Sequence, residues 1–182
     1  GNHGAARRII TRLSELLDNP GYLAQTTLEN CEDSSTARWT KSGNPGASIT
    51  MWSDPLRAPY GAGKQMKCHA AAAGDTFTYV GPAVYGGGLP DSSDPIIQWQ
   101  FRTASSMTWQ FEVTLTTSSN KVTKLKVTSD SAAAPSYNSG TKTITYPIGP
   151  GNDDDHFYDF NLQTLCAELA GDAWTLTTGF QL

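Results

Sequence analysis

The sequence has few charged residues, an excess of acidic over basic ones, and no long apolar run. It contains 13 Lys and Arg against 17 Asp and Glu, a formal net charge of −4. Nucleic-acid binding depends on many cationic contacts to phosphates, so this balance argues against a nucleic-acid partner and against an anionic membrane surface. No apolar stretch approaches the roughly 18 residues that suggest a spanning helix, and none resembles a signal peptide. We therefore expect no membrane insertion.

Because no initiating Met precedes Gly1, we expect the chain to be a fragment of a longer protein.

Cysteine and histidine are also scarce. The cysteines are Cys31, Cys68 and Cys166, and the histidines are His3, His69 and His156. Three cysteines without a CxxC spacing exclude a dense disulfide framework and argue against a zinc site. Either all three are small buried apolar residues, or Cys31 and Cys68 form one bridge between two early strands. No histidine stands in a motif typical of a catalytic triad.

What the sequence does contain is a clear strand pattern. From 107 to 116, apolar side chains alternate without a break with Thr, Gln and Glu. Successive side chains of a strand point to opposite faces, so this segment is predicted to have one buried and one solvated face. The alternation recurs at 97–102 and at 174–182, where one buried face is expected to carry Trp174, Leu176, Thr178, Phe180 and Leu182. Sheets with one solvated face are typically antiparallel.

Turn-forming residues divide the rest of the chain into short segments. Strands are predicted near 28–32, 36–41, 47–52, 64–70, 75–80, 96–103, 107–117, 122–129, 142–148, 156–161 and 173–182. Loops are predicted between them, including 135–140. Apolar residues spaced by three and four predict one short helix at 162–169. So many closely spaced strands predict an all-β, antiparallel β-sandwich or barrel rather than a parallel α/β sheet, and we adopt the sandwich.

The first 20 residues differ from the remainder. Ala6, Ile10, Leu13 and Leu17 are spaced by four, three and four, which predicts an amphipathic helix over 4–17. Pro20 ends it. Two interpretations remain open: the helix packs on the sandwich, or it is the stub of a coiled coil that makes a homo-oligomer. We divide the chain into a helix (1–20) and a β-sandwich domain (21–182).

Several segments together resemble a known family. They are Leu-Glu-Asn-Cys-Glu-Asp at 28–33, Trp39 and the strand at 48–52, Gly-Lys-Gln-Met-Lys at 63–67, the strands at 97–101 and 107–117, and the closing strand at 174–182. This order resembles carbohydrate-binding modules with a jelly-roll fold of the galactose-binding-domain-like type, over about residues 28–182. The resemblance implies a jelly-roll-like β-sandwich that binds a polysaccharide or a cell-surface glycan.

The resemblance also implies a structural Ca²⁺ between an acidic residue after the first strand and an Asp in the last strand. Glu32 and Asp33 match the first part, and carboxylates suit Ca²⁺. The last strand departs from the pattern, because Thr178 and Gly179 stand where the Asp is expected. The acidic run 153–155 lacks the spacing of a calcium loop and is interpreted as a solvated turn.

Carbohydrate recognition uses aromatic rings that stack on sugars, flanked by polar groups that bind their hydroxyls. Trp99, Trp109 and Trp174 are in phase with apolar neighbours and are predicted to lie in the core. The candidate platforms in or next to loops are Trp52, Tyr60, Tyr85 and Tyr137. The candidates for an open sheet face are the outward residues Gln98, Gln100, Arg102, Gln110 and Glu112.

These features favour a non-catalytic carbohydrate-binding module, presented by a longer and oligomeric protein in an extracellular setting or on a virion surface. The alternative is a structural fibre, spike or tail domain of a virus or phage, used for receptor binding or decoration. A jelly-roll hydrolase or lyase is a third reading, in which Glu112 would act with Asp153 or Asp159. Only Glu112 lies outward on a clearly patterned strand, so we expect no catalytic set.

Overall fold

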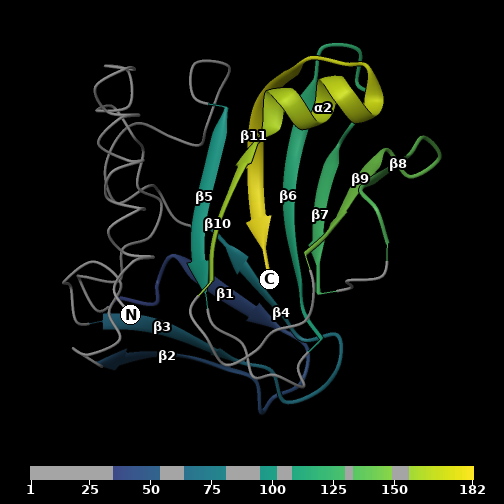
Figure 1. Cartoon of the computed structure of the whole chain (residues 1–182). Helices are drawn as coiled ribbons and strands as arrows, with labels where there is room; N and C mark the ends of the chain where they lie inside the picture. Colours follow the sequence, from purple (N-terminus) through teal and green to yellow (C-terminus); the bar gives the residue numbers. More distant parts are fainter. Residues whose placement is uncertain (1–34, 54–63, 81–94, 102–107, 130–132, 149–155) are drawn as a thin grey trace, which may run out of the picture.

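The computed structural model describes residues 35–53, 64–80, 95–101, 108–129, 133–148 and 156–182 (Figure 1). Over these ranges the chain forms eleven strands and one helix, α2. The all-β class is therefore confirmed. The predicted helix at 4–17 and the strand near 28–32 lie outside the described residues, and the jelly-roll connectivity stays a prediction.

Seven strands form one sheet in the order β1-β4-β11-β6-β7-β9-β8. Their bounds are β1 Trp39–Ser42, β4 Thr76–Tyr79, β6 Gln110–Thr117, β7 Lys124–Thr128, β8 Ser136–Asn138, β9 Thr143–Pro147 and β11 Trp174–Gln181. Two further pairs are antiparallel: β2 Ser48–Ser53 with β3 Lys64–His69, and β5 Ile96–Phe101 with β10 His156–Asn161. Helix α2 spans Leu162–Ala170.

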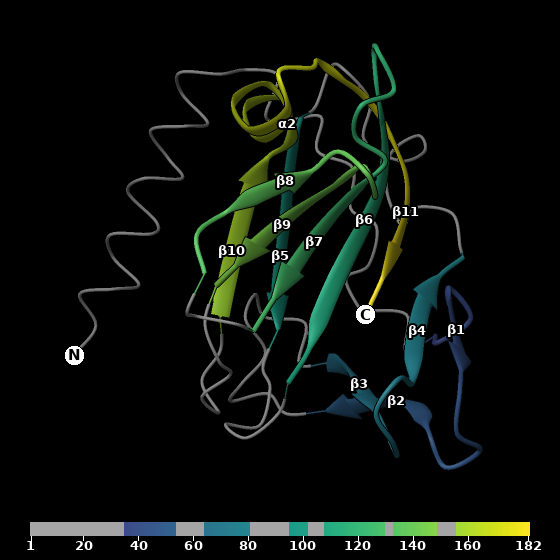
Figure 2. The ribbon, with the colours of Figure 1, turned by 90° about the vertical axis from the view of Figure 1, so that its right-hand side faces the viewer.

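The pair β5–β10 lies against one side of the large sheet, with α2 across one end and β2–β3 at the other (Figure 2). The rings of Tyr146 on β9 and Phe160 on β10 meet edge to face, with centroids 4.8 Å apart. The core between these layers is apolar. Its buried members are Tyr79, Ile97, Trp109, Phe111, Val113, Leu115, Val122, Leu125, Val127, Ile144, Phe160, Leu162, Cys166, Trp174 and Phe180. The core positions predicted for Trp109 and Trp174 are thus confirmed.

Strand β6 follows the predicted alternation. Phe111, Val113 and Leu115 are buried, whereas the side chains between them are half-buried or exposed. Strand β6, which pairs with β7 and β11, therefore has two chemically different faces. The inner face packs on the core, and the outer face is polar.

Two features of the sheet differ from the prediction. Strand β8 falls within 135–140, which was predicted to be a loop, and β9 pairs in parallel with β7, so the sheet is mixed rather than antiparallel. The chain leaves β7, forms β8 at the sheet edge and turns back as β9 between the two. Asn138 makes this turn by accepting hydrogen bonds from the amides of Gly140 and Thr141, at 2.9 and 3.0 Å. Strand β8 was missed because it is short and most of its neighbours are turn-forming residues. The parallel pairing was missed because alternation does not show in which direction a strand runs.

Strand β11 also departs from its predicted alternation. Trp174 and Phe180 are buried as expected, but Leu176 is 41% exposed and Thr177 is buried. The register against β6 shifts between 174 and 176 and again between 177 and 179. Each irregularity adds a residue to one strand only, which reverses the faces of the residues that follow. The expectation that five alternate residues share one face is therefore wrong.

Asp172 joins the turn between β6 and β7 to the end of α2. Its carboxylate accepts hydrogen bonds from the Ser118 hydroxyl at 2.8 Å and from the amides of Ser119 and Lys121, both at 3.1 Å. The side chain is only 6% exposed. Hydrogen bonds from the hydroxyl groups of Thr117 and Ser118 and from these amides hold the pKa of Asp172 well below its usual range, although burial opposes the shift.

A second carboxylate fixes the opposite end. Asp75 accepts from the amides of Asn44, Ala71 and Ala72 at 2.6, 2.7 and 2.8 Å, which joins the β1–β2 turn to the β3–β4 turn. The backbone of Gly43 passes directly over it with a φ of +111°, and a Cβ there would lie 3.0 Å from the Asp75 Cα. Only glycine satisfies both conditions.

The core assignment predicts a contrast between adjacent residues of β6. Leu115→Ala should lower the free energy of unfolding by about 2–5 kcal/mol, because Leu115 is 1% exposed and its loss leaves a cavity. Thr114→Ala, on the exposed face, should cost less than about 1 kcal/mol. Urea unfolding of the two variants measures the difference. Equal losses would contradict the orientation of the sheet.

The Asp172 cluster predicts a dependence on pH. A carboxylate whose pKa is depressed on folding stabilises the protein above its unfolded pKa, near 3.8, and this contribution is lost as the pH falls through the lower folded value. Asp172→Asn should therefore lower the thermal midpoint at neutral pH, and the deficit should shrink below about pH 4. The exposed Asp159 supplies the control Asp159→Asn. A deficit that is constant from pH 7 to pH 3 would exclude this role.

Candidate functional site

The outer face of the seven-stranded sheet carries an unbroken row of polar side chains. The strand registers place one polar residue of every strand in this central row, which runs Thr40, Thr78, Gln181, Glu112, Lys126, Thr145 and Ser136. Neighbouring strands lie about 4.8 Å apart, so the row extends over about 29 Å. Hydroxyl groups donate and accept hydrogen bonds, the ammonium group donates and the carboxylate accepts. We call this surface the polar face.

A second row of the polar face lies beside the central row. It consists of Gly179, Thr114, Lys124, Thr143 and Asn138. At Gly179 the face has no side chain: a Cβ placed there would meet only the Cβ and Oγ1 atoms of Thr114, both at 3.9 Å. The polar face therefore has a low point next to Gln181.

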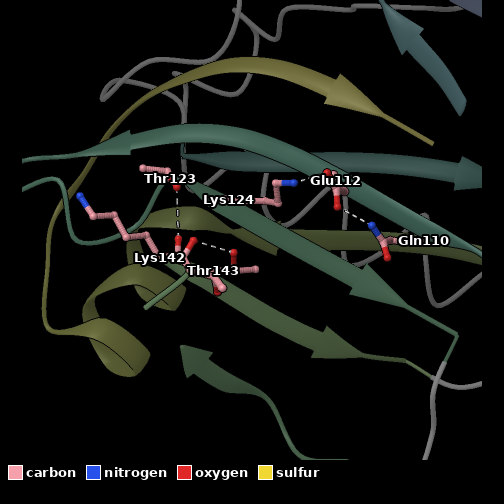
Figure 3. Close-up of polar contacts among 7 residues, drawn as sticks. Gln110, Glu112, Thr123, Lys124, Lys142 and Thr143 are labelled. Atoms are coloured by element: carbon pink, nitrogen blue, oxygen red, sulfur yellow. Dashed lines mark hydrogen bonds and ion pairs between the residues drawn. The ribbon is translucent and has the colours of Figure 1, made fainter. Parts of the chain in front are cut away.

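Glu112 is held in place by two neighbours. Its Oε1 atom accepts a hydrogen bond from Nε2 of Gln110, and its Oε2 atom lies 2.6 Å from Nζ of Lys124 (Figure 3). The Glu112 side chain is 16% exposed and that of Lys124 is 39% exposed. Both carboxylate oxygens already have a partner, so Glu112 orients its neighbours and presents a fixed acceptor.

The residues just before β7 and at the start of β9 are also fixed by hydrogen bonds (Figure 3). The amide of Thr123 donates to the carbonyl of Lys142 at 2.9 Å, and the hydroxyl of Thr143 donates to the carbonyl of Thr141 at 3.1 Å. Lys142 has a φ of +53° in the turn between β8 and β9. These contacts hold the parallel strands β7 and β9 in register, and with them Lys126 and Thr145 of the central row.

The structure brings together two of the five residues predicted for an open sheet face. Gln110 and Glu112 both lie on β6 and contact each other. Gln98 and Gln100 lie on β5, which pairs with β10 and does not belong to the seven-stranded sheet. Arg102 lies outside the described residues. Alternation assigns a residue to a face of its own strand, but it does not say which strands share a sheet.

The two aromatic candidates that the structure describes do not lie on this face. Trp52 lies in β2, within a strand, and Tyr60 and Tyr85 lie outside the described residues. Tyr137 is on β8, packs against the core and donates its hydroxyl to the carbonyl of Lys121 at 2.7 Å. Tyr137 is therefore an anchor for the edge strand. Across the seven described strands, every aromatic side chain is buried or packs against the core.

Sequence reasoning missed most of the central row. Lys126 and Gln181 are the largest of the omitted residues, and the alternation of Lys124 and Lys126 with buried Leu125 and Val127 was a usable signal. Gln181 had a signal as well, because alternation from Trp174 places it on the outer face and the two register shifts of β11 cancel before it.

No group of three or more metal-ligating side chains is found in the part of the chain that the structure describes. Glu32 and Asp33 lie outside that part, so the calcium site stays a prediction. The same holds for the Cys31–Cys68 bridge, because Cys31 is not among the described residues. Cys166 is buried, and burial, together with the charge of Asp172, raises the pKa of its thiol to about 11, which makes it unreactive. None of the described helices is long and apolar enough to cross a membrane.

Comparison with protein-family models finds no match, and comparison with curated proteins finds no similar sequence. The resemblance to carbohydrate-binding modules is therefore neither supported nor opposed by relatives. The polar face is therefore the feature of the described residues from which a function can be proposed.

The Glu112–Lys124 contact predicts a modest, salt-sensitive coupling. A double-mutant cycle with Glu112→Gln and Lys124→Met should give an interaction free energy of about 0.5–1 kcal/mol, because the pair is only partly buried. Raising the salt to 1 M should reduce it. Urea unfolding of the four proteins measures the coupling, and a value of zero at low salt would show that the pair does not form in solution.

Proposed function

We propose that this chain is a non-catalytic module that binds carbohydrate on the polar face. The central row is the observation that carries the proposal. Each of its seven side chains is a hydrogen-bond donor or acceptor, and they lie on seven hydrogen-bonded strands. A row of this kind matches an extended, hydroxyl-rich ligand, which offers many weak polar contacts and no single deep anchor.

The rigidity of the face favours binding. Glu112 is fixed by Gln110 and Lys124, and the loops at the two ends of the sheet are fixed by Asp172 and Asp75. Groups that are already ordered lose little conformational entropy when a ligand arrives. Affinity at one such open site is still expected to be weak, roughly micromolar to millimolar.

The chemistry of the face favours binding over turnover. Hydrolysis of a glycosidic bond uses two carboxylates that flank the bond. On the polar face of the described strands, Glu112 is the one carboxylate, and both its oxygens are engaged by neighbours. A homo-oligomer formed through residues 4–17, if present, would raise the affinity for a polymeric glycan through multivalency.

Gly179 provides the sharpest test. In Gly179→Val the new side chain fills the low point beside Gln181, where space is open. We expect binding to weaken about tenfold, by steric exclusion of the ligand. The thermal midpoint should stay equal or rise, since valine favours strands and glycine does not. A panel of neutral and acidic polysaccharides in affinity electrophoresis identifies the ligand, and calorimetry measures its affinity.

The control is Ala167→Val, which enlarges an exposed side chain on α2, away from the polar face. It should leave affinity unchanged. Equal weakening by both variants would place binding elsewhere. Shortened glycan products would show an enzyme. If the folded protein binds no glycan in the panel, the proposal fails and the structural fibre or tail domain becomes the better account.

A further inference from the structure

The charges of the polar face are unequal. Among its described strands the charged side chains are Glu112, Lys124 and Lys126, two lysines against one carboxylate. The chain as a whole has the opposite sign, with a formal net charge of −4. A positive centre on an acidic protein gives the face a preference that the overall charge does not predict.

The excess charge belongs to Lys126. Lys124 pairs with Oε2 of Glu112 at 2.6 Å, whereas the ammonium group of Lys126 has no ion pair or hydrogen bond with the residues described. Lys126 is nevertheless half-buried, although its neighbours along the strand, Leu125 and Val127, point to the opposite face, into the core. A partly desolvated ammonium group without a partner is unfavourable, and an anion that binds it removes part of that cost.

The neighbours of Lys126 suit a charged sugar. The register places Glu112 on one side of Lys126 and Thr145 on the other, with Ser136 beyond Thr145 at the sheet edge. A ligand anion at Lys126 is directed toward Thr145 and Ser136, because the Glu112 carboxylate repels it from the other side. The hydroxyl groups of Thr145 and Ser136 can then bind the sugar that carries the anion.

We propose that the polar face selects acidic glycans, with Lys126 as the residue that binds a carboxylate or sulfate group of the sugar. This inference rests on the proposed function and adds the ligand class. Lys126 contributes charge, whereas Gly179 contributes shape, so the two residues are tested independently.

The test compares glycans that differ only in charge. The probes are oligogalacturonate with its neutral methyl ester, and dextran sulfate with unmodified dextran; the first pair reports on carboxylate and the second on sulfate. Lys126→Gln keeps a long polar side chain and removes the charge. Calorimetry should show affinity for at least one acidic probe falling about three- to tenfold, and its salt dependence becoming shallower. Affinity for any neutral glycan that binds should not change.

The matched control is Lys67→Gln, which removes the same charge from an exposed position on β3, outside the seven-stranded sheet. It should leave acidic binding unchanged, and Lys126→Arg should retain it. Equal effects of the Lys67 and Lys126 variants would reduce the preference to net charge and overturn the inference. Equal affinity for neutral and acidic probes would also overturn the inference, but it would agree with the proposed function. If no glycan binds the folded protein at all, the proposed function fails with it.

Discussion

The two chemically different faces of β6 are the constraint on which the rest of this structure depends. Burying Phe111, Val113 and Leu115 removes large apolar surfaces from water, and it can do so only if every second residue points the other way. Strand β6 pairs with β11 on one side and with β7 on the other. Because paired residues point to the same face, the faces of β6 decide which residues of the neighbouring strands point outward. The polar face is the necessary counterpart of the core.

The ends of the sheet are stabilised differently from its middle. Hydrogen bonds to the carboxylates of Asp172 and Asp75 satisfy amides of the turns at the two ends of the sheet. Each carboxylate joins segments far apart in the chain, Asp172 to the β6–β7 turn and Asp75 to the β1–β2 turn. Because the turns are held, the strands between them keep their registers, and the central row remains aligned across the sheet.

Strand β11 connects the fold to the candidate site. Its two register shifts cancel: the first exposes Leu176 and buries Thr177, and the second restores the alternation that begins at Trp174. Phe180 therefore enters the core, while Gln181 and Gly179 face outward and pair with Glu112 and Thr114. The last residues of β11 thus supply both a polar group and the low point of the polar face.

By itself, the sequence determined the β class, the positions of most strands, the short helix and the outward orientation of Gln110 and Glu112. These follow from local periodicity, because the burial of one face imposes a period of two on each strand and of 3.6 on the helix. Only the tertiary structure decided that β5 belongs to a different sheet from β6, that β9 runs parallel to β7, and that Lys126 lies between Glu112 and Thr145. Strand neighbours and registers are set by contacts between distant segments. Periodicity within one segment carries no information about them.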